Sequence, residues 1–363
     1  MKKISPSDSA KNSKNLPGRL GNPDMSLIND PRAIPSITKV MSDYGLDALA
    51  PDPTISVEAT QKEKVDYMTS LEPLYEEIFE SWYSELPEVN GVERFVKTID
   101  GVDGNKITLY IHKPDKQNSN IPGILHIHGG GMSILKANNP NYIRWRDDLA
   151  STGLIVVGVE FRNVAGELGS HPFPAGLNDC SSALNWMFEN KEELDVSKII
   201  VSGESGGGNL TLATTLQAKK DKKLFQIDGV YAQCPYISNE YHRTINYLPS
   251  LDENNGYFLN VKDMAVMATA YDGIDSDNPL AWPLFATIED LNGLPPHVIS
   301  VNELDPLRDE GLLYYKKLLN AGVDASSITI NGTVHAGDMI FIKVTPKIYR
   351  SSIMHINNFA NSL

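Results

Sequence analysis

The chain has 363 residues, of which 41% are apolar, and a formal net charge of −14. This length can bury a large core, either as one domain with an elaboration or as two domains. The acidic excess disfavours nucleic acids and anionic membrane surfaces as partners, because both require clustered lysine and arginine.

The first 60 residues are rich in proline, serine, asparagine and aspartate and show little apolar periodicity. This composition predicts an irregular arm, partly disordered or draped over the rest of the protein. The N-terminus carries basic residues without the apolar stretch of a secretory signal, and the longest apolar run, residues 154–161, is too short to cross a bilayer. We therefore expect a cytoplasmic protein with no membrane span.

Residues 61–86 carry apolar side chains at steps of three and four, which predicts an amphipathic helix. We expect Pro73 to break or kink it, because proline removes a backbone donor and its ring clashes with the preceding turn. Residues 1–89, the arm and this helix, form the first predicted unit.

From about residue 90, strands and helices alternate along the chain. Two segments, residues 92–100 and 106–114, predict a hairpin. Further strands are expected near residues 123–130, 154–162, 198–204, 227–237, 296–304 and 326–331, and helices near residues 140–153, 174–194, 207–220, 309–322 and 346–363. Continuous apolar strands that alternate with helices predict an α/β fold with a mostly parallel central sheet covered on both faces.

Residues 236–285 separate two of these strands by more than a loop and one helix require. The interval is rich in aromatic residues, including Tyr236, Tyr257 and Trp282. Such an insertion is typical of a lid over the ligand-binding end of the sheet, and a peripheral helical decoration is the alternative. The predicted catalytic domain is therefore split into residues 90–235 and 286–363.

The two cysteines, Cys180 and Cys234, lie far apart and form no CxxC pair, so no zinc or redox motif is visible. Two buried thiols in a reducing compartment are favoured over a disulfide between them.

A single serine, Ser205, stands in a Gly-x-Ser-x-Gly pattern where a predicted strand becomes a predicted helix. Gly203 and Gly207 allow a tight turn because neither has a Cβ atom. This pattern at a strand-to-helix turn is typical of a nucleophile whose hydroxyl is exposed above the sheet. The N-terminus of the following helix favours negative charge that develops nearby.

A second motif, His128-Gly129-Gly130-Gly131, follows the predicted strand that ends near residue 127. Successive glycines let backbone N–H groups approach a ligand, and two such donors can form an oxyanion hole. We predict Gly130 and Gly131 as donors, together with Gly206 beside the serine. A phosphate-binding loop is disfavoured because no GK[ST] follows and no GxGxxG opens a helix.

A serine hydroxyl becomes a good nucleophile when a histidine removes its proton and a carboxylate orients that histidine. In proteins with this turn the chain order is serine, acid, histidine. The histidines after Ser205 are His242, His297, His335 and His355. We predict His335 as the base, because it alone lies in a loop directly after a predicted strand.

The acid is expected after the preceding strand. Asp305 is the first acidic residue past that strand, and Glu303 is the near competitor at the strand end. Asp309 and Glu310 fall in the first turn of the next helix, where acidic residues commonly stabilise the helix dipole, and Asp338 is interpreted in the same way. We predict Asp305 as the acid.

These residues give the chain a resemblance to the hormone-sensitive-lipase-like branch of the α/β-hydrolases, which includes the bacterial family IV esterases. The motifs that carry the resemblance lie at residues 128–131, 171–180, 203–210, 302–311 and 334–338. The resemblance covers roughly residues 90–345. It implies the α/β-hydrolase fold, with a helical cap built from the N-terminal region and the insertion at residues 236–285.

The resemblance also implies a carboxylesterase with the triad Ser205, Asp305 and His335. Such an enzyme requires neither a metal nor a cofactor, its partner is a small-molecule ester with a short acyl chain, and relatives are often homodimers. This chain departs from the family's common motifs at two places, and both departures bear on substrate preference. The family commonly has Asp-Ser-Ala where this chain has Glu204-Ser205-Gly206, and His-Gly-Phe where it has His335-Ala336-Gly337.

Other activities remain open at this point. An amidase or a lactonase could use the same triad. A non-catalytic receptor of esterase ancestry is the alternative from another class, and the presence of His335 argues against it because such receptors lose the catalytic histidine.

Overall fold

An eight-stranded sheet forms the centre of the computed structural model, which describes residues 18–116 and 120–363. The strand order is β1-β2-β4-β3-β5-β6-β7-β8. The β1–β2 and β2–β4 pairs are antiparallel, and the remaining pairs are parallel. The strands are β1 (Val92–Asp100), β2 (Lys106–Pro114), β3 (Ile121–Ile127), β4 (Ile155–Glu160), β5 (Val196–Glu204), β6 (Gly229–Gln233), β7 (His297–Asn302) and β8 (Ala325–Ile330).

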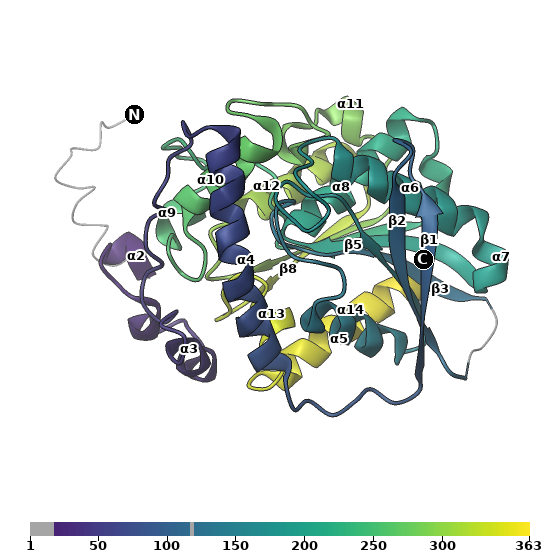
Figure 1. Cartoon of the computed structure of the whole chain (residues 1–363), viewed down its shortest axis with the longest axis horizontal. Helices are drawn as coiled ribbons and strands as arrows, with labels where there is room; N and C mark the ends of the chain where they lie inside the picture. The colour runs from purple at the N-terminus through teal and green to yellow at the C-terminus, as the bar shows by residue number, and fades with distance from the viewer. Residues whose placement is uncertain (1–17, 117–119) are drawn as a thin grey trace.

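Helices cover both faces of the sheet (Figure 1). One face is covered by α5 (Pro140–Ala150) and α14 (Pro346–Ser362), and the other by α6 (Ala175–Glu189), α8 (Gly206–Lys220) and α12 (Arg308–Asn320). The remaining helices are α2 (Gly18–Gly21), α3 (Pro35–Ser42), α4 (Gln61–Tyr83), α7 (Lys191–Leu194), α9 (Ser250–Glu253), α10 (Val261–Asp272), α11 (Ile288–Leu291) and α13 (Gly337–Ile340).

The core lies between the sheet and these helices. Strands β4, β5 and β6 are almost completely buried along their length, as expected for parallel strands covered on both faces. The edge strands β1 and β8 expose more of their side chains. The predicted fold class and the predicted hairpin are therefore confirmed.

Pro73 does not break its helix. The helix α4 runs without interruption from Gln61 to Tyr83, three residues shorter than predicted, and begins with a capping box between Thr60 and Glu63. Buried side chains on both sides of the proline, Met68 and Trp82 among them, anchor the two halves. Tertiary packing thus offsets the local cost of the proline.

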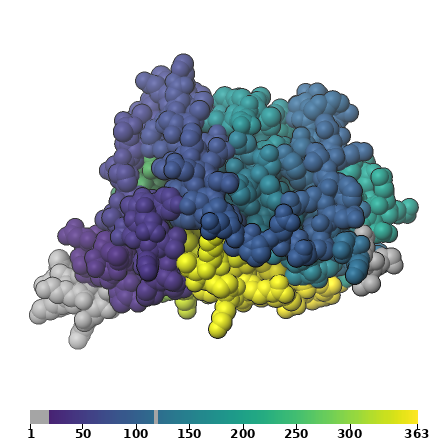
Figure 2. Space-filling view, turned by 60° about the horizontal axis from the view of Figure 1, so that its bottom comes forward, coloured from purple at the N-terminus to yellow at the C-terminus, as the bar shows by residue number. Residues whose placement is uncertain are grey.

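The arm before α4 is more regular than predicted. It contains the helix α3, in which Ile37 and Met41 lie one turn apart and are both buried. The backbone N–H of Ile34 donates to the carbonyl of Gly332, so the arm is attached to the C-terminal part of the catalytic domain. Figure 2 shows these N-terminal segments, in purple, beside the C-terminal segments in yellow. Residues 1–17, part of the predicted arm, lie outside the described residues.

Neither cysteine is bonded to another residue: Cys180 and Cys234 are free and buried, as predicted. Across residues 18–116 and 120–363, none of the helices has both the length and the apolar character that crossing a membrane requires.

Candidate active site

The turn between β5 and α8 holds Ser205 in an unusual backbone conformation, with φ 57° and ψ −119°. Non-glycine residues rarely adopt positive φ, and such strain is concentrated at functional sites. Two backbone hydrogen bonds hold the turn: the Ser205 N–H donates to Gln233 at 2.9 Å, and its carbonyl accepts from the Tyr236 N–H at 3.1 Å. The last residue of β6 and the loop that follows it therefore hold the serine in this conformation.

The turn packs directly on the end of β3. A Cβ atom at Gly207 would lie 2.0 Å from the carbonyl oxygen of Ile127, and one at Gly203 would lie 2.4 Å from the same oxygen. Side chains at either position would separate the turn from the strand. Both glycines of the pattern are thus required by close backbone contact.

The glycine loop after β3 runs beside the serine turn. Gly130 and Gly131 have φ values of 96° and 62°, which side-chain-bearing residues seldom adopt. A Cβ atom at Gly206 would lie 2.7 Å from the backbone nitrogen of Gly131. The amides of these two segments are therefore neighbours, as the predicted oxyanion hole requires.

The predicted acid and base come together from the ends of β7 and β8. Nδ1 of His335 lies 2.8 Å from Oδ2 of Asp305, and the second carboxylate oxygen accepts the N–H of Leu307 at 2.9 Å. Asp305 is fully buried and His335 nearly so. Because Nδ1 donates to the carboxylate, Nε2 is left to accept a proton.

The competing acidic residues have other partners. Glu303 accepts from the Gly332 N–H, Asp309 accepts from the Ser250 N–H, and Asp338 accepts from Asn302 and Ser352. The competing histidines are likewise elsewhere: His242 pairs with Asp275, His297 contacts the Pro295 carbonyl, and His355 contacts Tyr231.

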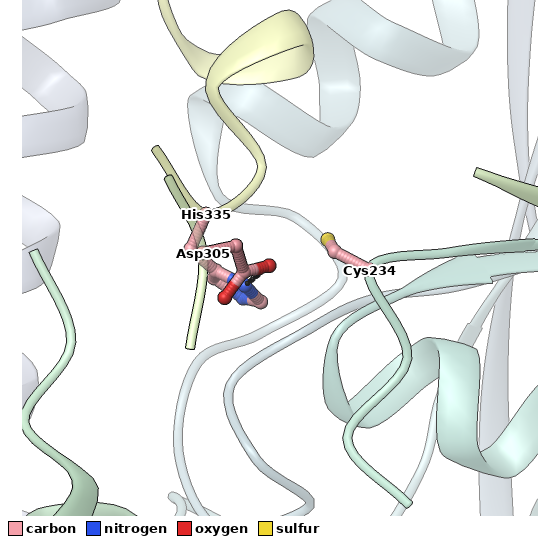
Figure 3. Close-up of side chains that lie close together, drawn as sticks. All are labelled: Cys234, Asp305 and His335. Carbon is pink, nitrogen blue, oxygen red and sulfur yellow. Dashed lines mark hydrogen bonds and ion pairs between the residues drawn. The ribbon is translucent and has the colours of Figure 1, made fainter. Parts of the chain in front are cut away.

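Cys234 lies beside this pair, at the end of β6 (Figure 3). Its sulfur and the ligand atoms of Asp305 and His335 all lie within 4.8 Å of one another, a spacing that could accept a metal ion. Burial raises the pKa of the Cys234 thiol well above its usual value, which favours the neutral thiol over the thiolate that binds metals. The Asp305–His335 hydrogen bond accounts for the proximity of the other two residues.

Ser205 and His335 line one cavity together with Gly129, Gly130 and Gly131. The cavity encloses about 730 Å³ that protein atoms do not fill, including its opening to solvent. Serine, imidazole and glycine amides therefore meet in a space that a small molecule can enter. This arrangement can add a serine oxygen to a carbonyl carbon and stabilise the resulting oxyanion.

Much of the remaining cavity lining is apolar and comes from segments outside the central sheet. Tyr75 and Phe79 belong to α4, and Phe258, Met264 and Met267 belong to the insertion at residues 236–285. The helices α4 and α10 contact one another, and the hydroxyl of Tyr67 donates to Asp263 at 2.6 Å across that contact.

Sequence reasoning missed the contact that Glu204 makes, and noted this residue only as a departure from the family pattern. Its Oε1 accepts the N–H of Gly129 at 2.6 Å, and its Oε2 lies 3.2 Å from Nε2 of His126. Burial raises the pKa of Glu204 to about 8. The only sequence signal was position, directly before the serine, because the contact joins residues 75 positions apart.

The pattern of the alpha/beta hydrolase fold family matches residues 124–338. The chain belongs to this family. It is 35% identical over 239 residues to an arylesterase of Saccharolobus solfataricus, which covers 64% of this chain and 72% of that protein. It is 34% identical over 272 residues to the carboxylesterase NlhH of Mycobacterium tuberculosis, covering 72% of this chain and 79% of that one.

Solved structures give the same result. Brefeldin A esterase, described as a bacterial homologue of human hormone sensitive lipase, superposes with a TM-score of 0.92 at 42% identity, over 95% of this chain and 98% of that one. Esterase Est22 superposes with a TM-score of 0.84 at 36% identity, over 93% and 99%. The resemblance to hormone-sensitive-lipase-like esterases is therefore confirmed.

Proposed function

We propose that this member of the alpha/beta hydrolase fold family is a serine carboxylesterase, with Ser205, His335 and Asp305 as its catalytic triad. The observation that carries the proposal is the single cavity lined by Ser205 and His335, with Asp305 hydrogen-bonded to the far side of the imidazole. The names of the relatives, arylesterase and carboxylesterase, support ester hydrolysis.

The proposed reaction has two steps. Ser205 Oγ attacks the ester carbonyl carbon while Nε2 of His335 takes its proton, and Asp305 stabilises the imidazolium. The imidazolium then protonates the leaving alcohol, which departs and leaves an acyl-enzyme. In the second step His335 takes a proton from water, the hydroxide adds to the acyl carbon, and Ser205 leaves with the proton as the acid is released.

The oxyanion of each step would be held by the backbone N–H groups of Gly130, Gly131 and Gly206. Removing one such donor typically raises the activation barrier by about 2.7–4 kcal/mol. The close packing of Gly206 on Gly131 supports donors that are already in position before the substrate binds. The N-terminus of α8, which begins at Gly206, adds a favourable dipole.

For the substrate we propose small esters with short acyl chains. Apolar side chains of α4 and of the insertion line the cavity and would limit the length of the acyl chain. These segments would act together as the cap, residues 1–89 with 236–285. Lactones and amides are alternative substrates of the same triad. The free thiols support a reducing, cytoplasmic compartment, and a homodimer stays a prediction.

The experiment is turnover of a series of p-nitrophenyl esters of increasing acyl length. We expect hydrolysis that is fastest for short chains, and Ser205→Ala to lower kcat by about 10⁴-fold or more while the fold is retained. Ser197→Ala, on the same strand but at its other end, is the matched control and should keep full activity.

A fluorophosphonate probe should label the wild type and the Ser197→Ala variant but not Ser205→Ala. Wild-type turnover by Ser205→Ala would show that another residue is the nucleophile. Absence of both labelling and turnover in a folded wild-type protein would favour the non-catalytic receptor of esterase ancestry, because the probe reacts only with an activated serine.

A further inference from the structure

Part of the lining of the catalytic cavity comes from one face of α10. Met264 and Met267 lie three positions apart on this helix, and both line the cavity. Met264 is buried, whereas Met267 is only partly buried. A methionine side chain is unbranched and flexible, so it fills irregular space between its neighbours. The two residues are therefore alike in chemistry and in helix face, and their contacts distinguish them.

Met267 packs on one of the glycines that we propose as oxyanion donors. A Cβ atom at Gly131 would lie 3.1 Å from Sδ of Met267 and 3.9 Å from Cε1 of Tyr236. Gly130 packs instead on its own loop, because a Cβ atom there would lie 2.0 Å from the carbonyl oxygen of Ile134. Of these two glycines, Gly131 is thus the one that the insertion at residues 236–285 covers.

The two side chains that cover Gly131 differ in how firmly they are held. Tyr236 is 2% exposed, its hydroxyl donates to the Met264 carbonyl, and its ring stacks on that of Tyr241 with 4.7 Å between the centroids. The thioether of Met267 is held by apolar packing. Tyr236 is therefore a fixed part of the wall, whereas Met267 can be shortened without removing a hydrogen bond of its side chain.

The thioether of Met267 lies close to where the ester group of a substrate would react. An oxyanion held by the Gly131 N–H lies about 2.7–3.1 Å from the donor nitrogen. The carbonyl carbon is one bond beyond that oxygen, and the first atoms of the acyl and alcohol parts are two bonds beyond it. A branch on the side that Met267 covers would therefore compete with the thioether for the same space.

We infer that Met267 is a specificity-determining residue and that the preferred substrates are esters whose acyl or alcohol chain is unbranched at the carbon next to the ester group. This inference rests on the proposed function, because it names the substrate class of the same site. An apolar wall discriminates about tenfold or more against one additional methyl group, since that group has to displace a packed side chain.

The experiment compares two pairs of isomeric esters with the purified full-length protein. p-Nitrophenyl butyrate and p-nitrophenyl isobutyrate differ by a branch in the acyl part, and propyl acetate and isopropyl acetate differ by a branch in the alcohol part. The measured quantity is kcat/KM of the linear isomer divided by kcat/KM of the branched isomer. In at least one pair we expect Met267→Ala to lower this ratio about tenfold or more from the wild-type value. The pair that responds tells on which side of the ester Met267 lies.

The comparison between variants removes two other effects on the ratio. The isomers differ in chemical reactivity, but this difference is the same for every variant, and a general loss of activity lowers both members of a pair alike. Met267→Leu restores most of the side-chain volume and should return the ratio toward the wild-type value. Met264→Ala is the matched control and should keep the wild-type ratio, because Met264 lines the cavity without lying within 4 Å of the Cβ position of Gly131.

A fall of less than about tenfold in both pairs for Met267→Ala, or an equal fall for Met264→Ala, would overturn the inference while leaving ester hydrolysis intact. Should either alanine variant not fold, Met267→Val and Met264→Val are measured in place of the alanine pair, under the same criteria. If the wild type hydrolyses none of the four esters nor any other p-nitrophenyl ester, the proposed function fails and the inference fails with it.

Discussion

At the scale of single residues, the candidate site combines groups that are strained, buried or both. Ser205 has a positive φ, Asp305 is fully buried, and Glu204 places a buried carboxyl group between the serine turn and the glycine loop. Sequence patterns pointed to the first two because each follows a strand. The contact of Glu204 with Gly129 depends on how β3 and β5 pair, and local patterns carry no signal for it.

Glu204 should make the stability of the protein depend on pH. Burial raises its pKa from 4.5 to about 8, so between these values the folded protein binds its proton more tightly than the unfolded chain does. The stabilisation is complete below the unfolded pKa and is lost as the pH rises through about 8. Relative to Glu204→Gln, which stays neutral, the wild type should lose free energy of unfolding between about pH 5 and pH 8.

Urea unfolding of both proteins at several pH values measures this difference. The glutamine keeps an oxygen that can accept the Gly129 N–H, so the variant is expected to fold. A difference in unfolding free energy that does not change with pH would mean that Glu204 has no raised pKa in the folded protein.

At the scale of elements, the turn between β5 and α8 depends on the backbone of β3. Its position was predictable, because a continuous apolar strand, a glycine-flanked serine and a new helix follow one another in the sequence. The sequence did not predict that α4 continues through Pro73, or that α3 forms. Packing against distant segments stabilises both helices.

Gly207→Ala should separate the serine turn from β3. The new Cβ atom would lie 2.0 Å from a backbone oxygen that cannot move independently, so we expect a loss of about 3 kcal/mol or more in unfolding free energy. Gly104→Ala is the control: nothing lies within 4 Å of its Cβ position, and its positive φ alone should cost about 1 kcal/mol. Equal losses in urea unfolding would show that the close contact is relieved cheaply.

At the scale of the whole molecule, the N-terminal arm is connected to the loop that carries Asp305, the predicted acid. Glu253 of α9 accepts from Arg32 of the arm and from Arg308 of α12. The next residue, Asn254, donates to the backbone carbonyls of Glu303 and Asp305, each at 3.0 Å. The arm and the insertion therefore help to hold the backbone at Asp305 in place.

Arg32→Ala should weaken this connection. The Arg32 side chain is 13% exposed and that of Glu253 is 5% exposed. The variant removes one charged partner from each of two buried carboxylates, while Glu253 keeps Arg308 and Asp30 keeps the Tyr257 hydroxyl, so we expect a cost of about 2 kcal/mol. We expect a lower Tm and a lower kcat, because Asp305 loses part of its support. Lys62→Ala removes an ion pair whose side chains are 83% and 61% exposed, and should change neither quantity appreciably. A variant Arg32→Ala with the Tm and kcat of the wild type would mean that the arm does not support the acid loop.

The amino-acid sequence alone determined the fold class and the family, and it predicts Ser205, Asp305 and His335 as the serine, the acid and the base. Local sequence patterns predict each of these: apolar runs of strand length, glycines at a turn, and polar residues directly after strands. Only the tertiary structure decided which residues surround them, including the Glu204–Gly129 contact and the attachment of the arm. Those features join segments far apart in the sequence, and such contacts form only when the sheet and its covering helices have packed.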